Sequence, residues 1–241
     1  MALMLRRGFI SLLLFVLAFS AAAQRRVSAN VEVKTLADGK VTTVTKRLFC
    51  QGNGRLVTVF DTPRQFYVIT NLKGELKMYV PSSNEVYSRL DKENSSESEL
   101  LYIFLSGRQD NLDLLRLGYT LQNSSLDQDG YLKRTYTTKK QDSPPKVELV
   151  MKDYLPIYVG YLDHSGNTVA KLYLSNYSKY SGFVFPSRVT EVTFNKEKKD
   201  SVVVRSVYSS VSTDGGDPLF DYQVPSGAKP AGNPMDVLKK K

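Results

Sequence analysis

Hydrophobic and polar residues alternate with a period of two along most of this chain. Such runs occur at 31–35, 41–45, 47–50, 55–60, 65–70 and 76–80, and again at 119–122, 131–137, 147–152, 156–162, 169–176, 188–194 and 201–211. Alternation sends successive side chains to opposite faces of a strand, so each run predicts a β-strand with one apolar face. Turn-forming pairs such as Asp38-Gly39 and Lys73-Gly74 separate the runs. The pattern predicts one large, curved antiparallel sheet.

One apolar segment with helical patterning, Ser96–Gly118, interrupts the strands. Ser96 and Glu99 fit a capping box in front of Leu100–Leu105, and Gly107 is a typical helix end. This pattern favours a short helix, although periodicity alone also permits a buried strand or a core helix over the same residues.

A second short helix is predicted for Asp110–Gly118. Together the two helices would cover the apolar face of the sheet, either tightly as ordinary core or loosely as a lid over a cavity. An apolar cavity takes an apolar ligand, and acyl chains fit because burial is worth about 0.8 kcal/mol per methylene. The residues expected to line the cavity or the lid are Phe60, Ile69, Met78, Leu101, Phe104, Leu105, Leu112 and Leu115.

The first residues have the pattern of a secretory signal. Arg6 and Arg7 precede an apolar run at 8–20, and Ala21-Ala22-Ala23 supplies a small-residue cleavage site. The run is short for a membrane span, which needs about 20 residues. Gln24 stands where a bacterial lipoprotein would have a cysteine. We therefore expect residues 1–23 to be a signal peptide and the mature protein to be soluble, exported and free of a lipid anchor.

The remaining chain is long enough for one domain with an ample core, expected over residues 24–228. The stretch 229–241 is rich in Pro, Gly and Lys, which predicts a flexible basic tail. Removal of Arg6 and Arg7 lowers the formal charge from +9 to +7. Lysines collect at loop-like places, at 139–140, 196–199 and 239–241, where they are solvated, or they attract phospholipid head groups or an acidic protein surface. Nucleic acid is not expected as a partner.

Residues that could carry catalysis are scarce. Cys50 is the only cysteine and His164 the only histidine, so neither a disulfide within the chain nor a zinc site of several such residues can form. Cys50 lies in a predicted strand and is expected to be buried, and His164 lies in a predicted turn. No nucleophile-elbow, phosphate-loop or dinucleotide motif occurs. We expect no enzyme, cofactor or metal, although paired carboxylates that meet in space would leave no local pattern.

Several short phrases occur in the order typical of one known family. They are the Gly52–Leu56 turn, Asp61-Thr62-Pro63, the Met78–Val86 strand, the apolar insert, and a closing Leu219–Ala228 segment with a proline-glycine ending. In this layout, residues 30–228 resemble the LolA-like outer-membrane lipoprotein carriers. The resemblance implies a mainly β fold with an α lid, an open, curved antiparallel half-barrel covered by short helices. It also implies a soluble periplasmic carrier that shields acyl chains of lipoproteins on their way to the outer membrane.

The resemblance also implies partners and a lid contact. The cargo would be an acylated lipoprotein or a lipid, passed from an inner-membrane release complex to an outer-membrane acceptor by a monomeric carrier. Carriers of this family close the lid through an arginine early in the sheet, and Arg55 lies nearest to that position. Gln24 favours a carrier over the lipid-anchored receptor of the same fold. The alternative is a lipid- or lipoprotein-sensing regulatory or interaction module of the cell envelope on this fold.

Overall fold

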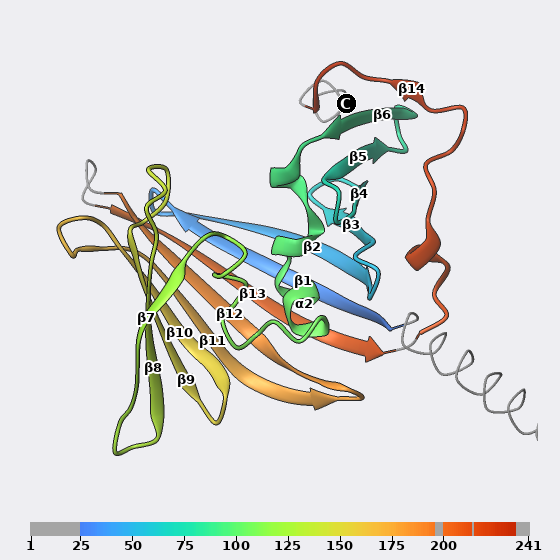
Figure 1. Cartoon of the computed structure of the whole chain (residues 1–241). Helices are drawn as coiled ribbons and strands as arrows, with labels where there is room; N and C mark the ends of the chain where they lie inside the picture. The colour runs from blue at the N-terminus through green and yellow to red at the C-terminus, as the bar shows by residue number, and fades with distance from the viewer. Residues whose placement is uncertain (1–24, 196–199, 214, 235–241) are drawn as a thin grey trace, which may run out of the picture.

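The computed structural model describes residues 25–195, 200–213 and 215–234, and its strands form one open, curved 14-stranded sheet (Figure 1). The expected signal peptide, residues 1–23, lies outside the described residues. The strands before the insert are β1 (Arg26–Ala37), β2 (Lys40–Gln51), β3 (Leu56–Thr62), β4 (Phe66–Thr70), β5 (Glu75–Val80) and β6 (Glu85–Leu90). Those after it are β7 (Thr120–Leu126), β8 (Tyr131–Thr137), β9 (Lys146–Lys152), β10 (Leu155–Leu162), β11 (Thr168–Tyr180), β12 (Phe183–Asn195) and β13 (Asp200–Thr213).

Strand order follows chain order in two blocks. The order is β14-β6-β5-β4-β3-β2-β1-β13-β12-β11-β10-β9-β8-β7, so β1 joins the two blocks by pairing with β2 and β13. All these pairs are antiparallel except the short parallel contact of β14 (Lys229–Pro230) with β6. The predicted antiparallel meander is confirmed.

The first hairpin shows how local sequence sets the register. Asp38 and Gly39 both have left-handed backbone conformations, with φ of 49° and 70°. Two such central residues make the turn whose twist matches that of paired strands, and the Asp-Gly pair is suited to it. The hairpin predicted at this pair is confirmed, and the runs 41–45 and 47–50 merge into the single strand β2.

The two faces of the sheet bury different sets of side chains. The inner face is the face on which the short helix α2 (Leu100–Leu105) lies, and it includes Val31 of β1, Leu48 of β2 and Tyr208 of β13. Figure 1 shows β3–β6 and β7–β12 on either side of this helical segment, with the sheet curving around it. On the outer face, η3 (Pro218–Asp221) places Phe220 against the Phe49 ring, edge to face, with centroids 5.4 Å apart.

The first predicted helix is confirmed, but its predicted cap is wrong. Glu99 is the N-cap residue and makes no side-chain capping bond. The Ser96 hydroxyl donates to the Gly54 carbonyl instead, because Ser96 already belongs to a separate 3-10 turn, η2 (Ser96–Ser98). Another such turn, η1 (Lys92–Asn94), precedes it. The predicted stop at Gly107 is confirmed, since Gly107 has a φ of 75°.

The second predicted helix, Asp110–Gly118, is wrong. These residues form successive turns, because Leu112 and Asp113 have φ values of 46° and 65° that a right-handed helix does not accept. Single turn bonds remain, such as Leu114 N–H to the Asn111 carbonyl at 3.0 Å.

The first residues of the predicted flexible tail, 229–241, pair with β6. The Lys229 and Ala231 amides donate to the carbonyls of Asn84 and Val86, at 2.8 and 2.9 Å. These bonds add β14 to the free edge of β6. Residues 235–241 lie outside the described residues.

Leu101 has no exposed surface, whereas Leu115, in the loop that follows α2, is 55% exposed. We expect Leu101→Ala to lower the free energy of unfolding by about 2–5 kcal/mol, because truncating a buried leucine removes its packing and leaves a cavity. The matched change Leu115→Ala should alter it by no more than about 0.5 kcal/mol. Urea denaturation followed by circular dichroism measures both. Equal effects of the two substitutions would contradict the packing described here.

Candidate functional site

Helix α2 closes the inner face by packing its side chains into the sheet. Five of its six residues, Leu101 to Leu105, are buried. The Phe104 ring meets Phe185 of β12 edge to face at 5.3 Å and lies 6.2 Å from the ring of Tyr177. A six-residue helix is much smaller than the face that it covers, so space remains on both sides of it.

The segment 96–118, which contains α2 and the loop after it, is called the lid segment here. A mainly apolar cavity of about 330 Å³ lies between the lid segment and strands β10–β13. Leu100, Ile103 and Leu112 line it from the lid side, and Leu172, Val189 and Tyr208 line it from the sheet. The charged residues in its lining are Asp113, Arg116 and Glu191. Burial raises the pKa of Tyr161, which also lines this cavity, to about 12. The same cause raises the pKa of Tyr208. Both phenols therefore stay neutral at physiological pH and add no charge to the cavity.

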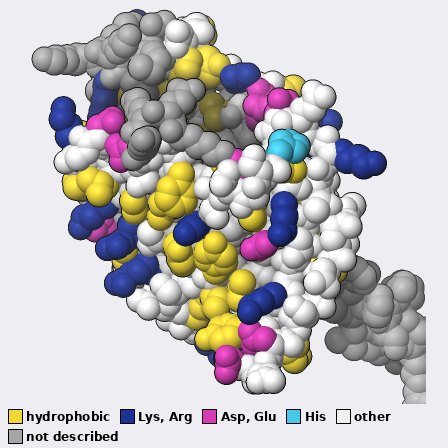
Figure 2. Space-filling view, turned by 90° about the vertical axis from the view of Figure 1, so that its left-hand side faces the viewer, with side chains coloured by type: hydrophobic (Ala, Val, Ile, Leu, Met, Phe, Trp, Pro, Cys, Tyr) yellow, Lys and Arg dark blue, Asp and Glu magenta, His cyan; other side chains and the backbone are white. Residues whose placement is uncertain are grey.

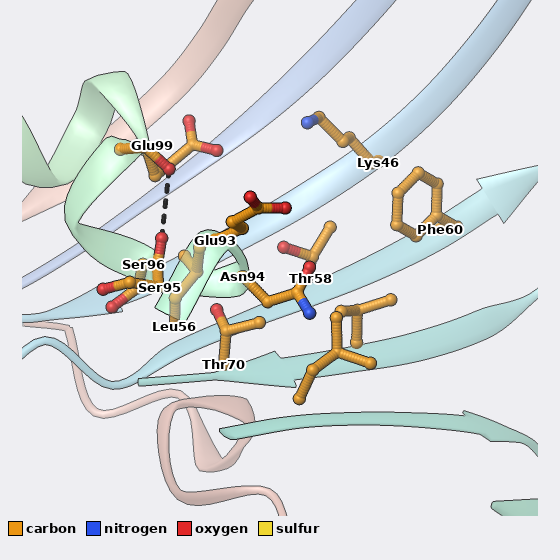
Figure 3. A pocket seen from close by; sticks show the side chains of 13 residues that line it. Lys46, Leu56, Thr58, Phe60, Thr70, Glu93, Asn94, Ser95, Ser96 and Glu99 are labelled. Atoms are coloured by element: carbon orange, nitrogen blue, oxygen red, sulfur yellow. Dashed lines mark hydrogen bonds between the residues drawn. The ribbon is translucent and has the colours of Figure 1, made fainter. Parts of the chain in front are cut away.

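A second cavity, of about 270 Å³, lies on the other side of the lid segment against β2–β5 (Figure 3). Phe60 and Leu56 line it from β3, and Lys46 reaches it from β2. Figure 3 shows Glu93 and Glu99 facing the same space from the helical turns. This cavity is the more polar of the two. Ser98 lines both cavities, so the segment that leads into α2 separates them.

An ionic cluster holds the loop after α2 in shape. Asp113 is buried and accepts hydrogen bonds from Arg108, at 2.8 Å, and from Arg116. Glu97 approaches the same arginines, 3.3 Å from Arg116 and 4.0 Å from Arg108. All four residues belong to the segment 97–116, so the cluster ties the lid to itself and not to the sheet.

Polar attachment of the lid to the sheet is sparse. The Arg134 guanidinium of β8 donates to the Asp110 carbonyl at 2.9 Å, and the Ser96 hydroxyl donates to the Gly54 carbonyl. The Ser96 amide donates to the Asn71 carbonyl at 3.2 Å, and the Thr138 hydroxyl donates to the Gly118 carbonyl at 3.0 Å. Helix α2 itself is attached to the sheet by the packing of its side chains. Arg134 was missed from the sequence because its role depends on the loop that folds back over β8.

Cys50 lies on the inner face, in the same core cluster as α2, and is fully buried. Burial raises the pKa of the Cys50 thiol, with a further contribution from the nearby Glu99 carboxylate. The predicted buried thiol is confirmed. His164 is exposed in the β10–β11 turn, as predicted, and the Asp163 carboxylate shapes that turn by accepting the Ser165 and Asn167 amides. Cys50 and His164 are thus not brought together.

The predicted lining residues separate into three groups. Leu101, Phe104 and Leu105 of α2 lie in the inner core, and Leu112 packs against it and lines the apolar cavity. Phe60 lines the polar cavity, and Met78 lies in the neighbouring cluster with Val68 and Leu76. Ile69 and Leu115 lie elsewhere: Ile69 packs in the outer-face cluster, and Leu115 is exposed to solvent. The lining roles themselves remain predictions.

The expected contact between Arg55 and the lid is absent from the described structure. Arg55 donates from Nε to the Phe220 carbonyl at 3.2 Å and from Nη2 to the Tyr222 carbonyl. The reason is strand alternation: Leu56 points to the inner face, so Arg55, its neighbour, points to the outer face. Arg55 therefore anchors the C-terminal segment instead.

The inner-face positions of β10–β13 were missed as lining residues. Tyr161, Leu172, Val189 and Tyr208 all lie in predicted strands, and their apolar alternation marked them as candidates for a core face. Which of them meet under α2 depends on the pairing register, which alternation within single strands does not give.

Within residues 25–195, 200–213 and 215–234, no group of three or more Cys, His, Asp or Glu residues could hold a metal ion. In the same part of the chain, no helix combines the length and the apolar character needed to cross a membrane.

Comparison with known proteins shows that the fold is similar to that of several solved structures. No protein-family model matches the chain, and no curated protein sequence matches it. Among solved structures, a putative outer-membrane lipoprotein-sorting protein domain from Vibrio parahaemolyticus is similar, with a TM-score of 0.54, 15% identity, and coverage of 81% of this chain and 89% of that one. A LolA superfamily protein from Nitrosomonas europaea has a TM-score of 0.52 and 14% identity over 78% and 86% of the two chains.

A DUF1329 family protein from Desulfovibrio piger is also similar, with a TM-score of 0.55 and 14% identity over 85% of this chain and 93% of that one. The chain therefore has a LolA-like fold, an open, curved sheet with few helices. The resemblance inferred from the sequence phrases is confirmed at the level of the fold.

We expect Asp113→Asn to loosen the loop 106–118, because the neutral amide no longer balances Arg108 and Arg116. Hydrogen bonds to a charged group contribute about 1.5–3 kcal/mol each. Hydrogen exchange should therefore speed up at the Leu114, Leu117 and Tyr119 amides, whose partners lie within this loop. Asp110→Asn is the matched control, since Asp110 is exposed in the same loop. Unchanged exchange in Asp113→Asn would show that the cluster does not stabilise the loop.

Proposed function

We propose that the protein is a periplasmic carrier that shields the acyl chains of a lipoprotein, or of another lipid, on the inner face of its sheet. The observation that supports this best is the closure of a large apolar face by one short helix with cavities on both sides. The LolA-like fold agrees with it. In this proposal the protein is a monomer, takes cargo from an inner-membrane complex, delivers it to an outer-membrane acceptor, and carries out no catalysis.

The energetics of the lid favour reversible loading. Displacing α2 exposes five buried side chains at about 1.5–3 kcal/mol each, which totals on the order of 10 kcal/mol. An acyl chain regains about 0.8 kcal/mol for each buried methylene, so roughly a dozen methylenes balance the displaced helix. Near balance is what a carrier needs, because cargo held far more tightly could not be released. A donor or acceptor then shifts the populations by binding one state better than the other.

The two cavities differ in polarity in a way that suits an amphipathic ligand. Aliphatic and aromatic side chains make up most of the lining of the cavity against β10–β13, where Asp113 and Arg116 pair with each other and Glu191 is the remaining charged residue. Polar side chains, Lys46, Glu93 and Glu99 among them, make up most of the lining of the cavity against β2–β5. When α2 moves aside, the two cavities join, because only the segment at Ser98 separates them. Acyl chains would occupy the first cavity, and the polar end of the cargo would lie in the second.

Native mass spectrometry of the protein purified from an envelope fraction tests the proposed function. The expected result is a population with the added mass of an acylated ligand. Persistent absence of any adduct, after challenge with several lipids and an acylated peptide, would contradict the carrier. If crosslinking in the envelope then captured a stable, stoichiometric protein partner, the sensing or interaction module would be the better account.

Phe104→Ala should favour the open state. Truncating a buried phenylalanine removes about 3–5 kcal/mol of packing from the closed state, whereas the open state is little affected. Because the apparent affinity for a ligand scales with the fraction of open protein, binding of a fluorescent long-chain fatty acid should become tighter. Modification of the buried Cys50 by a thiol reagent should also become at least about tenfold faster.

Phe220→Ala is the matched control for this prediction. It removes a phenylalanine that is equally buried but lies on the outer face, so it should destabilise the fold without changing fatty-acid affinity. Equal acceleration of Cys50 modification by both substitutions, at matched stability, would show that the thiol reports global unfolding. Such a result would count against a separately movable lid.

A further inference from the structure

An apolar stripe crosses the outer face of the sheet, opposite the face that α2 covers. Strand pairing places its four members side by side on β2, β1, β13 and β12; they are Val41, Leu36, Val203 and Val192. Val41 is 65% exposed and Leu36 is 42% exposed. Side chains on one face of paired strands lie about 5 Å apart, so the four form a continuous strip.

Cations flank this stripe. Lys34 of β1 lies directly opposite Arg205 of β13, and both are exposed. This pair lies two residues along the strands from the Leu36–Val203 pair, a distance of about 7 Å. Arg188 of β12 lies opposite Val207, the next outer-face residue of β13 after Arg205. Lys171 of β11 continues the apolar row opposite Val192, and its ammonium group lies 5.5 Å from the centre of the Phe194 ring.

Positive charge is in excess on this part of the outer face. Glu32, which pairs with Lys34 at 2.9 Å, is the only acid among the described outer-face residues of β1, β2, β11, β12 and β13. Within the described structure, the guanidinium groups of Arg205 and Arg188 make no hydrogen bond or ion pair. Like charges directly opposite each other destabilise a sheet. Glu32 balances only one of these two facing cations, so the excess positive charge favours a partner with negative charge.

We propose that this outer face, defined by the aliphatic stripe and by Lys34, Arg205, Arg188 and Lys171, docks onto an anionic phospholipid bilayer. The cations would pair with lipid phosphates, and the exposed aliphatic side chains would enter the head-group region between them. An acidic protein would match the cations but not the apolar strip. A second copy of this chain would bring the cations against each other. The proposal does not depend on the carrier function, because it concerns the opposite face of the sheet.

Vesicle co-sedimentation of the full chain tests the proposal, with phosphatidylcholine vesicles and with vesicles that also contain phosphatidylglycerol. The protein should bind only the anionic vesicles, and less as salt rises. The double substitution Lys34→Gln with Arg205→Gln should weaken binding on the order of tenfold to thirtyfold, since each cation near the surface contributes roughly a factor of five. Val41→Asp, at an exposed position, should weaken it as well.

The matched control is Lys73→Gln with Lys77→Gln, which removes the same charge from exposed positions at and after the β4–β5 turn. This control should bind the anionic vesicles within about twofold of the unmodified protein. The proposal fails if the two double variants lose binding equally, because general positive charge would then explain it. It also fails if no anionic vesicle binds, or if light scattering shows that Val41→Asp dissociates a dimer of this chain. Thermal melting by circular dichroism verifies that each variant is folded.

Discussion

The closure of an open apolar sheet face by one short helix is the interaction on which the rest of the structure depends. A curved sheet with two free edges, β14 and β7, leaves its inner side chains to be covered by something else. Helix α2 supplies part of that cover with only six residues, five of them buried, and the loop after it adds the buried Leu114. Because so few residues seal so large a face, the seal is incomplete, and the cavities beside Ser98 are its direct consequence.

The outer face of the sheet is covered over some strands and exposed over others. Over β2–β4 it is covered by the C-terminal segment, in which Phe220 packs against Phe49 and Arg55 binds the carbonyls of Phe220 and Tyr222. Farther along the sheet, Leu36 of β1 and Val41 of β2 remain exposed, and Val203 of β13 and Val192 of β12 beside them are half-buried. Figure 2 shows one side of the molecule, on which hydrophobic side chains are interspersed with many Lys and Arg and fewer acidic residues. Anchoring the C-terminal segment also explains why Arg55 does not contribute to the lid.

The sequence predicted the strands well because alternation and turn chemistry are local. Asp38-Gly39 favours its turn whatever the rest of the chain does. The faces were harder to predict: in β4, Tyr67 and Ile69 alternate with Phe66 and Val68, so both faces are apolar and the pattern cannot say which one is inner. The second helix failed for a related reason. The leucines near residue 113 suggest a helix, but the Asp113 carboxylate joins two arginines in a left-handed turn.

The composition of the ionic cluster bears on how the lid could move. Glu97, Arg108, Asp113 and Arg116 all lie in the lid segment, so displacement of that segment as one body would keep their ion pairs intact. Opening would break few hydrogen bonds: those of Ser96 with Gly54 and Asn71, of Arg134 with Asp110, and, where the far end also moves, of Thr138 with Gly118. Buried charges separated from their partners would make opening costly, and this arrangement avoids that cost. The free-energy cost of opening is therefore mainly the loss of apolar burial by α2. An incoming acyl chain offsets this cost because its own methylenes become buried.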